Sequence, residues 1–84
     1  MKKYYLYILQ SEKDGSFYVG ITSDIEKRLL FHNNGWQRYT KNKRPWKLVY
    51  IREFSSKSEA LKQERKIKKK KSKKYIKWLI DNAG

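Results

Sequence analysis

Two polar side chains occupy the face of a predicted helix that should pack against the rest of the protein. We expect this helix over residues 24–32, where Ile25 and Leu29 recur at the spacing of one face. Arg28 and His32 fall on the same stripe. Burying an unpaired charge is costly, so this face calls for a partner or a ligand. The alternative is an arginine at the rim of the stripe, with its stem packed and its guanidinium in solvent. The pattern alone leaves both open.

A second predicted helix, over residues 57–70, carries a carboxylate in the same kind of position. Glu64 lies near the middle of an apolar stripe that includes Ala60 and Ile67. An ion pair with Lys68, four residues later, is the simplest interpretation. Lys68 is close to the same stripe, however, so both side chains would face inward. An arginine, a histidine and a glutamate facing inward from two helices would form a polar cluster of the kind that holds a phosphate and a metal ion.

Tyrosines of two predicted strands are further candidates. Tyr7 belongs to an alternating pattern in the first strand, and Tyr18 precedes Val19-Gly20 in the second. Gly20 inside a strand indicates a bulge or a close approach of another group to the backbone. For most of the seven tyrosines in the chain, ordinary packing on a sheet is the better interpretation.

Turn and cap residues set the elements that must position these side chains. Asp14-Gly15 is a hairpin signal between two apolar strands, and Ser23 and Ser56 each stand three residues before a glutamate, as in a capping box. We expect strands over residues 4–9, 16–22 and 48–54, and helices over residues 24–32, 57–70 and 72–81. Residues 36–46 are expected to form a loop.

The order ββαβαα predicts one small α/β (α+β) domain. The first two strands pair as a hairpin and the third returns after a helix, so a three-stranded sheet flanked by helices satisfies the order. We expect residues 1–84 to form this single domain, with a basic helical segment over about residues 62–84.

Composition narrows the classes of function. Lys and Arg total 22 against 8 Asp and Glu, a formal net charge of +14, which favours nucleic acid over an anionic membrane as the partner. The chain has no cysteine and one histidine, which excludes disulfides, thiolate metal sites and a zinc site built on several imidazoles. No apolar run reaches the length of a membrane span, and the first residues begin a strand pattern instead of a signal peptide. We therefore expect a cytoplasmic protein without a membrane role.

Two segments are candidates for contact with nucleic acid. From Lys62 to Lys77 there are ten basic residues and one acidic residue, which favours a segment that binds phosphates over a solvated tail. The predicted loop interleaves aromatic and basic residues, as stacking platforms do, although its tryptophans would equally suit cover for the sheet edge, Trp46 in particular. The candidate nucleic-acid-binding residues are Arg38, Lys41, Lys43, Arg44, Lys69, Lys70, Lys71, Lys73 and Lys74.

Motifs across about residues 4–70 resemble those of the GIY-YIG nuclease family. Tyr5-Leu6-Tyr7 and Tyr18-Val19-Gly20 are similar to the two tyrosine motifs that name the family. Arg28 stands ten residues after the second tyrosine, His32 follows one turn later, and Glu64 lies in a helix that resembles the one bearing the metal-binding glutamate of the family. The resemblance is to the small, single-domain members, distantly similar to the nuclease domain of UvrC.

The resemblance implies a three-stranded antiparallel sheet and a metal-dependent endonuclease that hydrolyses phosphodiester bonds in DNA, in repair or recombination. It implies that Tyr7 or Tyr18 helps to activate water, that Arg28 holds the phosphate, that His32 bonds a tyrosine or the nucleophile, and that Glu64 binds one Mg²⁺ or Mn²⁺. These roles suit the reaction, because a cation and a guanidinium stabilise the charge that develops on the phosphate. A tyrosine, with an ordinary pKa of roughly 10, needs a nearby cation to act as a base.

The chain departs from the family pattern at three points, and one of them, the missing asparagine, motivates an alternative together with the small size of the chain. The first motif lacks its glycine, Ile21 stands where UvrC-like members have lysine, and Ile76 stands where many members have asparagine. The alternative is a non-catalytic nucleic-acid-binding module that retains the fold. Activity could also be weak or need a protein partner, and we expect a monomer or a weak dimer.

Overall fold

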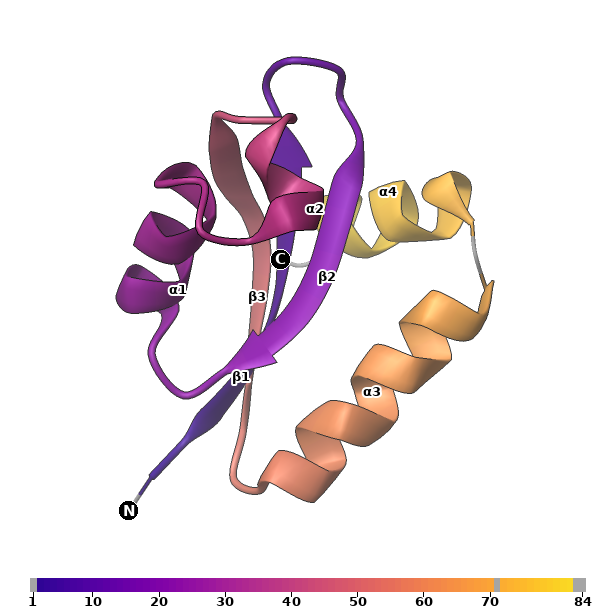
Figure 1. Cartoon of the computed structure of the whole chain (residues 1–84). Coiled ribbons are helices and arrows are strands. Elements are labelled where there is room, and N and C mark those ends of the chain that lie inside the picture. The colour runs from indigo at the N-terminus through magenta and orange to yellow at the C-terminus, as the bar shows by residue number, and fades with distance from the viewer. Residues whose placement is uncertain (1, 71, 83–84) are drawn as a thin grey trace.

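The computed structural model describes residues 2–70 and 72–82 of the 84-residue chain. Its centre is a three-stranded antiparallel sheet of β1 (Tyr4–Ser11), β2 (Phe17–Thr22) and β3 (Trp46–Phe54). The strand order is β2-β1-β3, so β1 is central and β2 is an edge strand (Figure 1). The predicted α+β class and the three-stranded antiparallel sheet are confirmed.

The hairpin between β1 and β2 turns at the predicted Asp14-Gly15 pair. Gly15 has a φ of 76°, a left-handed conformation that glycine adopts without steric cost. The Asp14 carboxylate accepts hydrogen bonds from the backbone N–H and the hydroxyl of Ser16, at 2.9 and 2.6 Å. These bonds also hold the pKa of Asp14 well below its usual range. The turn therefore sets the register that pairs Tyr7 with Gly20.

The first helix, α1 (Ile25–Asn33), begins one residue later than its sequence pattern indicated. The expected N-cap, Ser23, is wrong. Asp24 is the cap, and its carboxylate accepts the backbone N–H of Lys27 at 3.1 Å. The helix ends one residue beyond its predicted end, with Asn34 as the C-cap, and Gly35 follows with a φ of 75°.

A single helical turn, α2 (Arg38–Lys41), interrupts the segment that was expected to be a loop. Two longer helices close the chain: α3 (Lys57–Lys70) and α4 (Lys73–Asp81). The hydroxyl of Ser56 accepts the N–H of Glu59, as the capping box predicted, and Ser72 caps α4 in the same way. No helix in the described part of the chain is long and apolar enough to cross a membrane.

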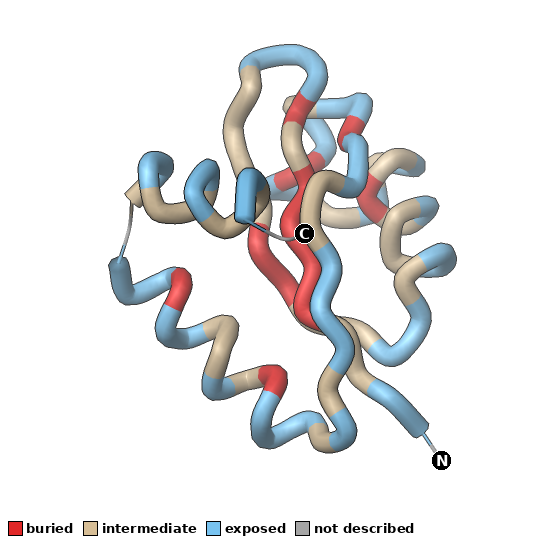
Figure 2. Tube along the Cα trace, turned by 180° about the vertical axis from the view of Figure 1, so that it is seen from behind, coloured by how far each residue is buried: buried red, intermediate tan, exposed pale blue. Residues whose placement is uncertain are grey.

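The two faces of the sheet carry separate apolar clusters. Leu6, Ile8 and Val19 pack against Ile67 of α3 on one face, where α4 also adds apolar side chains. Tyr7, Leu9 and Trp46 pack on the other face, against α1. Buried residues are concentrated along the middle of the sheet, while each helix buries only isolated positions (Figure 2). The core is therefore thin, and alternate residues of β1 serve opposite faces.

Trp46, expected to pack and not to stack on a ligand, is 3% exposed. Its indole N–H donates to the backbone carbonyl of Thr40 at 2.9 Å. Asn33 at the end of α1 holds the backbone of Trp46 through both its side-chain oxygen and its side-chain nitrogen, at 2.7 and 3.1 Å. These bonds tie α1 and α2 to the first residue of β3.

Candidate active site

A chain of three buried polar side chains forms the centre of the candidate site. The Tyr7 hydroxyl lies 3.0 Å from Nε2 of His32, and Nδ1 of His32 lies 3.0 Å from the hydroxyl of Thr40. Tyr7 is 2% exposed, and His32 and Thr40 are fully buried. The inward orientation expected for His32 is confirmed, and its polar partners are a tyrosine of β1 and a threonine of α2.

The surroundings keep both members of the Tyr7–His32 pair uncharged. Burial, together with the positive charge of Arg28, lowers the pKa of His32 to about 4. Burial is also the main cause that raises the pKa of the Tyr7 hydroxyl far above its usual value; Tyr18 and Glu64 raise it further, and Arg28 opposes the shift. At neutral pH the site therefore holds a neutral phenol and a neutral imidazole.

The hydrogen-bond partners also indicate which nitrogen of His32 carries the proton. The Thr40 hydroxyl has two oxygen acceptors of Gln37, the backbone carbonyl and Oε1, each at 3.4 Å. A hydroxyl that donates toward Gln37 accepts from Nδ1–H of His32, which leaves Nε2 to accept the phenol proton of Tyr7. Thr40 thus orients the imidazole so that its free lone pair faces Tyr7.

Gly20 provides the space that the Tyr7 side chain occupies. A Cβ atom at position 20 would lie 2.6 Å from the Tyr7 oxygen and 2.7 Å from its Cζ, well inside van der Waals contact. The close approach predicted for Gly20 is therefore confirmed. It follows that the Tyr7 hydroxyl lies over the edge strand β2.

Tyr18 is the half-buried tyrosine of the cluster. Its ring centroid lies 4.7 Å from that of His32 and 6.3 Å from that of Tyr7. The side-chain amide of Gln37 donates to its hydroxyl at 3.2 Å. Tyr18 also lines an open hollow of about 550 Å³, whereas Tyr7 is enclosed. Of the two tyrosines, Tyr18 is the one within reach of a ligand.

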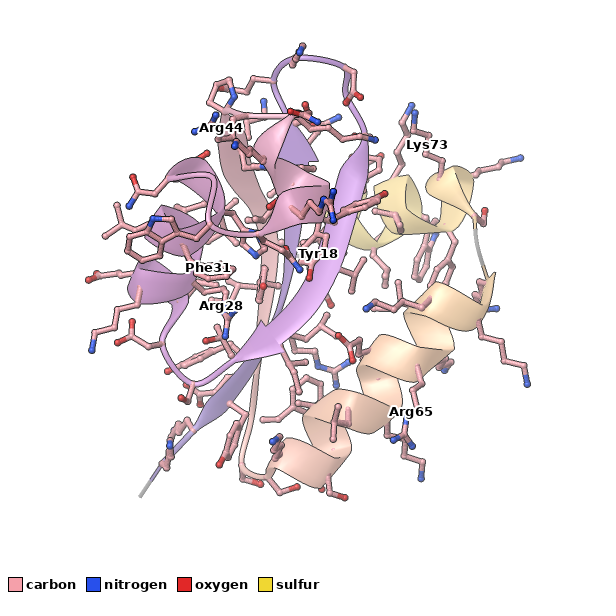
Figure 3. All side chains as sticks on the ribbon, viewed as in Figure 1. Tyr18, Arg28, Phe31, Arg44, Arg65 and Lys73 are labelled. Carbon is pink, nitrogen blue, oxygen red and sulfur yellow. The ribbon has the colours of Figure 1, made fainter. Side chains whose placement is uncertain are left out.

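Arg28 approaches the cluster from α1. It is half-buried, and its guanidinium carbon lies 4.9 Å from the ring centre of Phe31. Figure 3 shows both side chains on α1, on the opposite side of the view from Arg65 and Lys73, with Tyr18 between. Within residues 2–70 and 72–82, Arg28 makes no ion pair with a carboxylate. Its N–H groups are therefore not taken up by a carboxylate of these residues and can donate to a phosphate.

Glu64 approaches from α3, and its negative charge helps to raise the pKa of the Tyr7 hydroxyl. Its side chain is 17% exposed and lies 3.3 Å from Nζ of Lys68, which is 53% exposed. The ion pair between these residues, predicted as the simplest interpretation, is confirmed. Solvent screens the exposed Lys68 end of this pair, which limits its strength. Lys68 is therefore a weak competitor for the Glu64 carboxylate.

The donors around Glu64 suit one kind of metal ion and not another. In the described part of the chain no group of three or more His, Asp or Glu side chains converges. Zinc sites need three or four such ligands, but Mg²⁺ is commonly held by one or two carboxylates, with water and substrate phosphate completing its shell. The residues present therefore fit Mg²⁺ or Mn²⁺ held by Glu64 and a substrate.

The chain is similar to known proteins over most of its length. The GIY-YIG catalytic domain matches residues 3–76. The chain belongs to the GIY-YIG family. A UPF0213 protein of Staphylococcus saprophyticus is 55% identical over 69 residues, which cover 81% of this chain and 83% of the relative. A UPF0213 protein of Streptococcus pneumoniae is 41% identical over 81 residues, which cover 95% and 81%.

A solved structure is similar as well. The solution NMR structure of a UPF0213 protein from Bacillus halodurans matches with a TM-score of 0.62 and 35% identity, covering 98% of this chain and 86% of that one. The resemblance drawn from the sequence motifs is thus confirmed, as is the fold that it implied. This family of nuclease domains makes nucleic acid the expected class of substrate.

The basic residues predicted to bind nucleic acid differ in their exposure and in their contacts with other groups of this GIY-YIG domain. Arg38 and Lys41 are exposed. Lys43 is half-buried, with its Nζ 3.6 Å from Asp14, and Nε of Arg44 donates to the carbonyl of Lys41 at 2.8 Å. Lys43 and Arg44 thus have roles in holding the segment around α2, whatever else they contact.

The lysines of α3 and α4 form the second predicted contact. Those at positions 69, 70, 73 and 74 are exposed, and Nζ of Lys70 lies 4.8 Å from the ring centre of Tyr75. Lys71 lies outside the described residues. The charge is therefore presented outward by two helices, on the side of the domain away from Arg28 (Figure 3).

Two residues of the site had no signal in the sequence. Thr40 and Gln37 lie in the segment around α2, which reads as an irregular loop, and neither matches a family motif or a helical stripe. Their roles depend on contacts with His32 and Tyr18, which are distant in sequence. Only the packing of α2 against α1 brings them into the site.

Proposed function

We propose that this protein is a metal-dependent endonuclease that hydrolyses phosphodiester bonds in DNA, in a repair or recombination process. The observation that carries the proposal is the buried Tyr7–His32 hydrogen bond of 3.0 Å, beside which the half-buried Tyr18 ring lies 4.7 Å from that of His32 and lines an open hollow. Arg28 from α1 and Glu64 from α3 act in opposite directions on the pKa of the Tyr7 hydroxyl. Such convergence is expected of a reacting centre more than of a structural core.

Tyr18 is the residue we assign to the attacking water. Its hydroxyl accepts a hydrogen bond from Gln37 and keeps its own proton and remaining lone pair for a ligand in the hollow. Tyr7 is enclosed and cannot meet a ligand in the hollow, so Tyr18 is the tyrosine that can hold and orient the water by hydrogen bonds. We assign Tyr7 and His32 to positioning the Tyr18 ring and excluding water behind it.

Arg28 is assigned to the phosphate that is cleaved. Hydrolysis forms a bond from the water oxygen to phosphorus and breaks the bond to the leaving oxygen, and negative charge grows on the phosphate oxygens. A guanidinium that lies over the Phe31 ring keeps its N–H groups in the plane of the guanidinium, where they can meet two of these oxygens at once. Lysines on α3 and α4 would hold the neighbouring phosphates without taking part in the reaction.

Glu64 would hold the divalent ion. When bound, Mg²⁺ or Mn²⁺ would supply positive charge beside the phosphate and favour hydroxide over water as the nucleophile. The carboxylate is suited to this because it is largely shielded from solvent and its ion pair with Lys68 is weak. A phosphate that draws Lys68 toward itself would free the carboxylate for the ion.

A cleavage screen with a matched pair of variants tests the proposal. Purified protein is incubated with branched, nicked and duplex DNA in Mg²⁺ or Mn²⁺ and, separately, in EDTA. Glu64→Gln should abolish cleavage, while Glu59→Gln, an exposed position on the same helix, should leave it unchanged. Circular dichroism should report the same helix content for both. Cleavage that persists in EDTA, or in Glu64→Gln, would refute the role of the metal.

The alternative is a nucleic-acid-binding module without catalysis. It is favoured by the departures from the family pattern at Tyr5, Ile21 and Ile76, and by the lysine already paired with the Glu64 carboxylate. The same screen separates the two proposals. Tight binding of DNA with no cleavage of any substrate in either metal would favour the module.

A further inference from the structure

An open hollow adjoins the catalytic cluster on the side of β2, α3 and α4. Its volume is about 550 Å³, within the range of roughly 300–1,000 Å³ that small-ligand pockets occupy. Tyr18 and Gln37, which belong to the site already described, form one wall. Phe17, Val19 and Ile76 supply apolar surface, and Tyr39 and Lys68 complete the lining. The hollow is therefore directly adjacent to the candidate active site.

Tyr39 has an exposure that packing does not explain. Its side chain projects from α2 and is 61% exposed, although it is large and aromatic. Its ring centroid lies 6.2 Å from that of Tyr18, with the ring planes 41° apart, and Nζ of Lys43 lies 5.5 Å from its ring centre. Lys43 in turn pairs with Asp14. The ring is thus held in place from behind while one side remains open to the hollow.

The chemistry of the lining favours a flat, uncharged group attached to an anion. Of the described residues that line the hollow, Lys68 alone carries a charge, and its ammonium lies at one wall beside Glu64. The other walls are aromatic and aliphatic side chains and the amide of Gln37. A nucleobase has two apolar faces and a polar edge, and its own phosphate lies one sugar away. Aromatic side chains bind bases of any sequence by stacking in this way.

We propose that this hollow is a nucleobase subsite, in which Tyr39 stacks on the base of a nucleotide next to the cleaved phosphate. The proposal rests on the nuclease function proposed above and adds a property of its substrate. A base in a continuous duplex presents only its edges, so a base that enters the hollow has left its stack. The protein therefore prefers a nucleotide that is already unpaired to one that must be extracted from a duplex.

Binding measured without metal tests the subsite separately from catalysis. The probe is a short fluorescein-labelled oligothymidylate, titrated in EDTA and followed by anisotropy. Tyr39→Ala should weaken binding by roughly five- to 150-fold, the range for loss of one base stacked on an aromatic side chain. Tyr39→Phe keeps the ring and should bind as the unaltered protein does. Trp78→Ala removes an aromatic side chain that is 58% exposed on α4 but lies outside the hollow, and should also leave binding unchanged.

Two further measurements make the test specific to stacking. Tyr39→Ala should leave the slope of log affinity against log salt unaltered, because no phosphate contact is lost. It should also reduce the preference for the single strand over its duplex. An oligothymidylate with one 5-iodouracil, which crosslinks to aromatic side chains stacked on it, should label Tyr39 or Tyr18 on irradiation.

The outcomes are distinct from those of the cleavage screen. No binding by the unaltered protein, equal affinity of Tyr39→Ala and the unaltered protein, or crosslinks confined to residues outside the hollow would each overturn the subsite. Since every measurement is made in EDTA, a protein that binds in this manner but never cleaves DNA would refute the nuclease proposal and leave the subsite standing.

Discussion

Replacing Gly20 by alanine should disrupt the candidate site through one added methyl group. The new Cβ would lie 2.6 Å from the Tyr7 oxygen, 2.7 Å from Cζ and 3.1 Å from Cε1. Carbon atoms in proteins settle at about 3.5–4.0 Å, so the ring must retreat by about 1 Å. Tyr7 is 2% exposed and bonded to His32, and it has no free space into which to retreat.

The expected loss of stability follows from these contacts. Overpacking a close-packed region costs about 1–3 kcal/mol. Displacing the phenol also breaks its buried hydrogen bond with His32, which adds about 1 kcal/mol. Gly20→Ala should therefore lower the free energy of unfolding by about 2–4 kcal/mol. This is a large share of the stability of a small domain, about 5–15 kcal/mol in total.

A double-mutant cycle assigns this loss to the tyrosine. In a Tyr7→Leu background the ring is absent, and alanine in a strand is more favourable than glycine by about 0.5–1 kcal/mol. The same substitution should then be neutral or stabilising, so the coupling between the two positions should be at least about 2 kcal/mol. A Tyr7→Phe background is the matched control: Cζ remains 2.7 Å from the new methyl, so most of the loss should persist.

Urea unfolding followed by tryptophan fluorescence supplies all six free energies. The His32 ring nitrogen signals in NMR spectra report separately whether Gly20→Ala has broken the bond from Tyr7. Equal losses from Gly20→Ala in the tyrosine and leucine backgrounds would refute the reasoning, because the cost would then belong to the strand and not to the contact between Gly20 and Tyr7.

Four other predictions concern the charges and hydrogen bonds of the site. His32 has a pKa of about 4 folded and about 6.5 unfolded, so the unfolded chain binds its proton first as pH falls. The contribution of His32 to the free energy of unfolding should be fully present above pH 6.5, and it should fall by up to about 3 kcal/mol by pH 4. Urea unfolding at a series of pH values measures this fall. The same series with His32→Gln should lack it. Thr40→Val leaves Nδ1–H of His32 without an acceptor and should lower the free energy of unfolding by about 1–3 kcal/mol. Thr40→Ser keeps a hydroxyl and should lower it by less. The NMR shifts of the imidazole nitrogens show whether the tautomer of His32 changes. Arg28→Ala should keep most DNA affinity and lower turnover by roughly 10²–10³-fold in a cleavage assay, because its contact matters most in the transition state. Replacing Lys69, Lys73 and Lys74, three exposed lysines, by glutamine should instead weaken binding to all sequences alike. It should also flatten the slope of log affinity against log salt by up to roughly 0.9 per lost phosphate contact on duplex DNA. An unchanged slope would place this segment away from nucleic acid.

The elements of this fold were predictable where local rules act alone. The bounds of α3 follow from a serine cap and an uninterrupted helical stripe, and Gly15 and Gly35 mark turns that need a left-handed residue. The cap of α1 was assigned to the wrong residue because Ser23 and Asp24 are both good caps and stand side by side. The position of the Lys27 N–H decides between them, and only three-dimensional structure gives it.

The site was predictable to the extent that it breaks these local rules. His32 stands out because a histidine on an apolar stripe must find a partner, and Arg28 and Glu64 stand out for the same reason. Thr40 breaks no rule, since a threonine in a polar loop is ordinary. Its importance comes from the packing of α2 on α1, which no local periodicity encodes.

The edge position of β2 explains how two helices can act on one phenol. A side chain on the central strand of a sheet normally meets groups on one face only. Gly20 lets the Tyr7 ring cross over the edge strand, and there its hydroxyl is influenced both by Arg28 of α1 and by Glu64 of α3, which packs against the other face. An edge strand is also the part of a small sheet that a long polymer can pass without entering a closed cavity. Gly20 therefore does more than admit a bulky side chain, because it places the Tyr7 ring over the edge strand beside Tyr18, the residue that we propose to meet the attacking water.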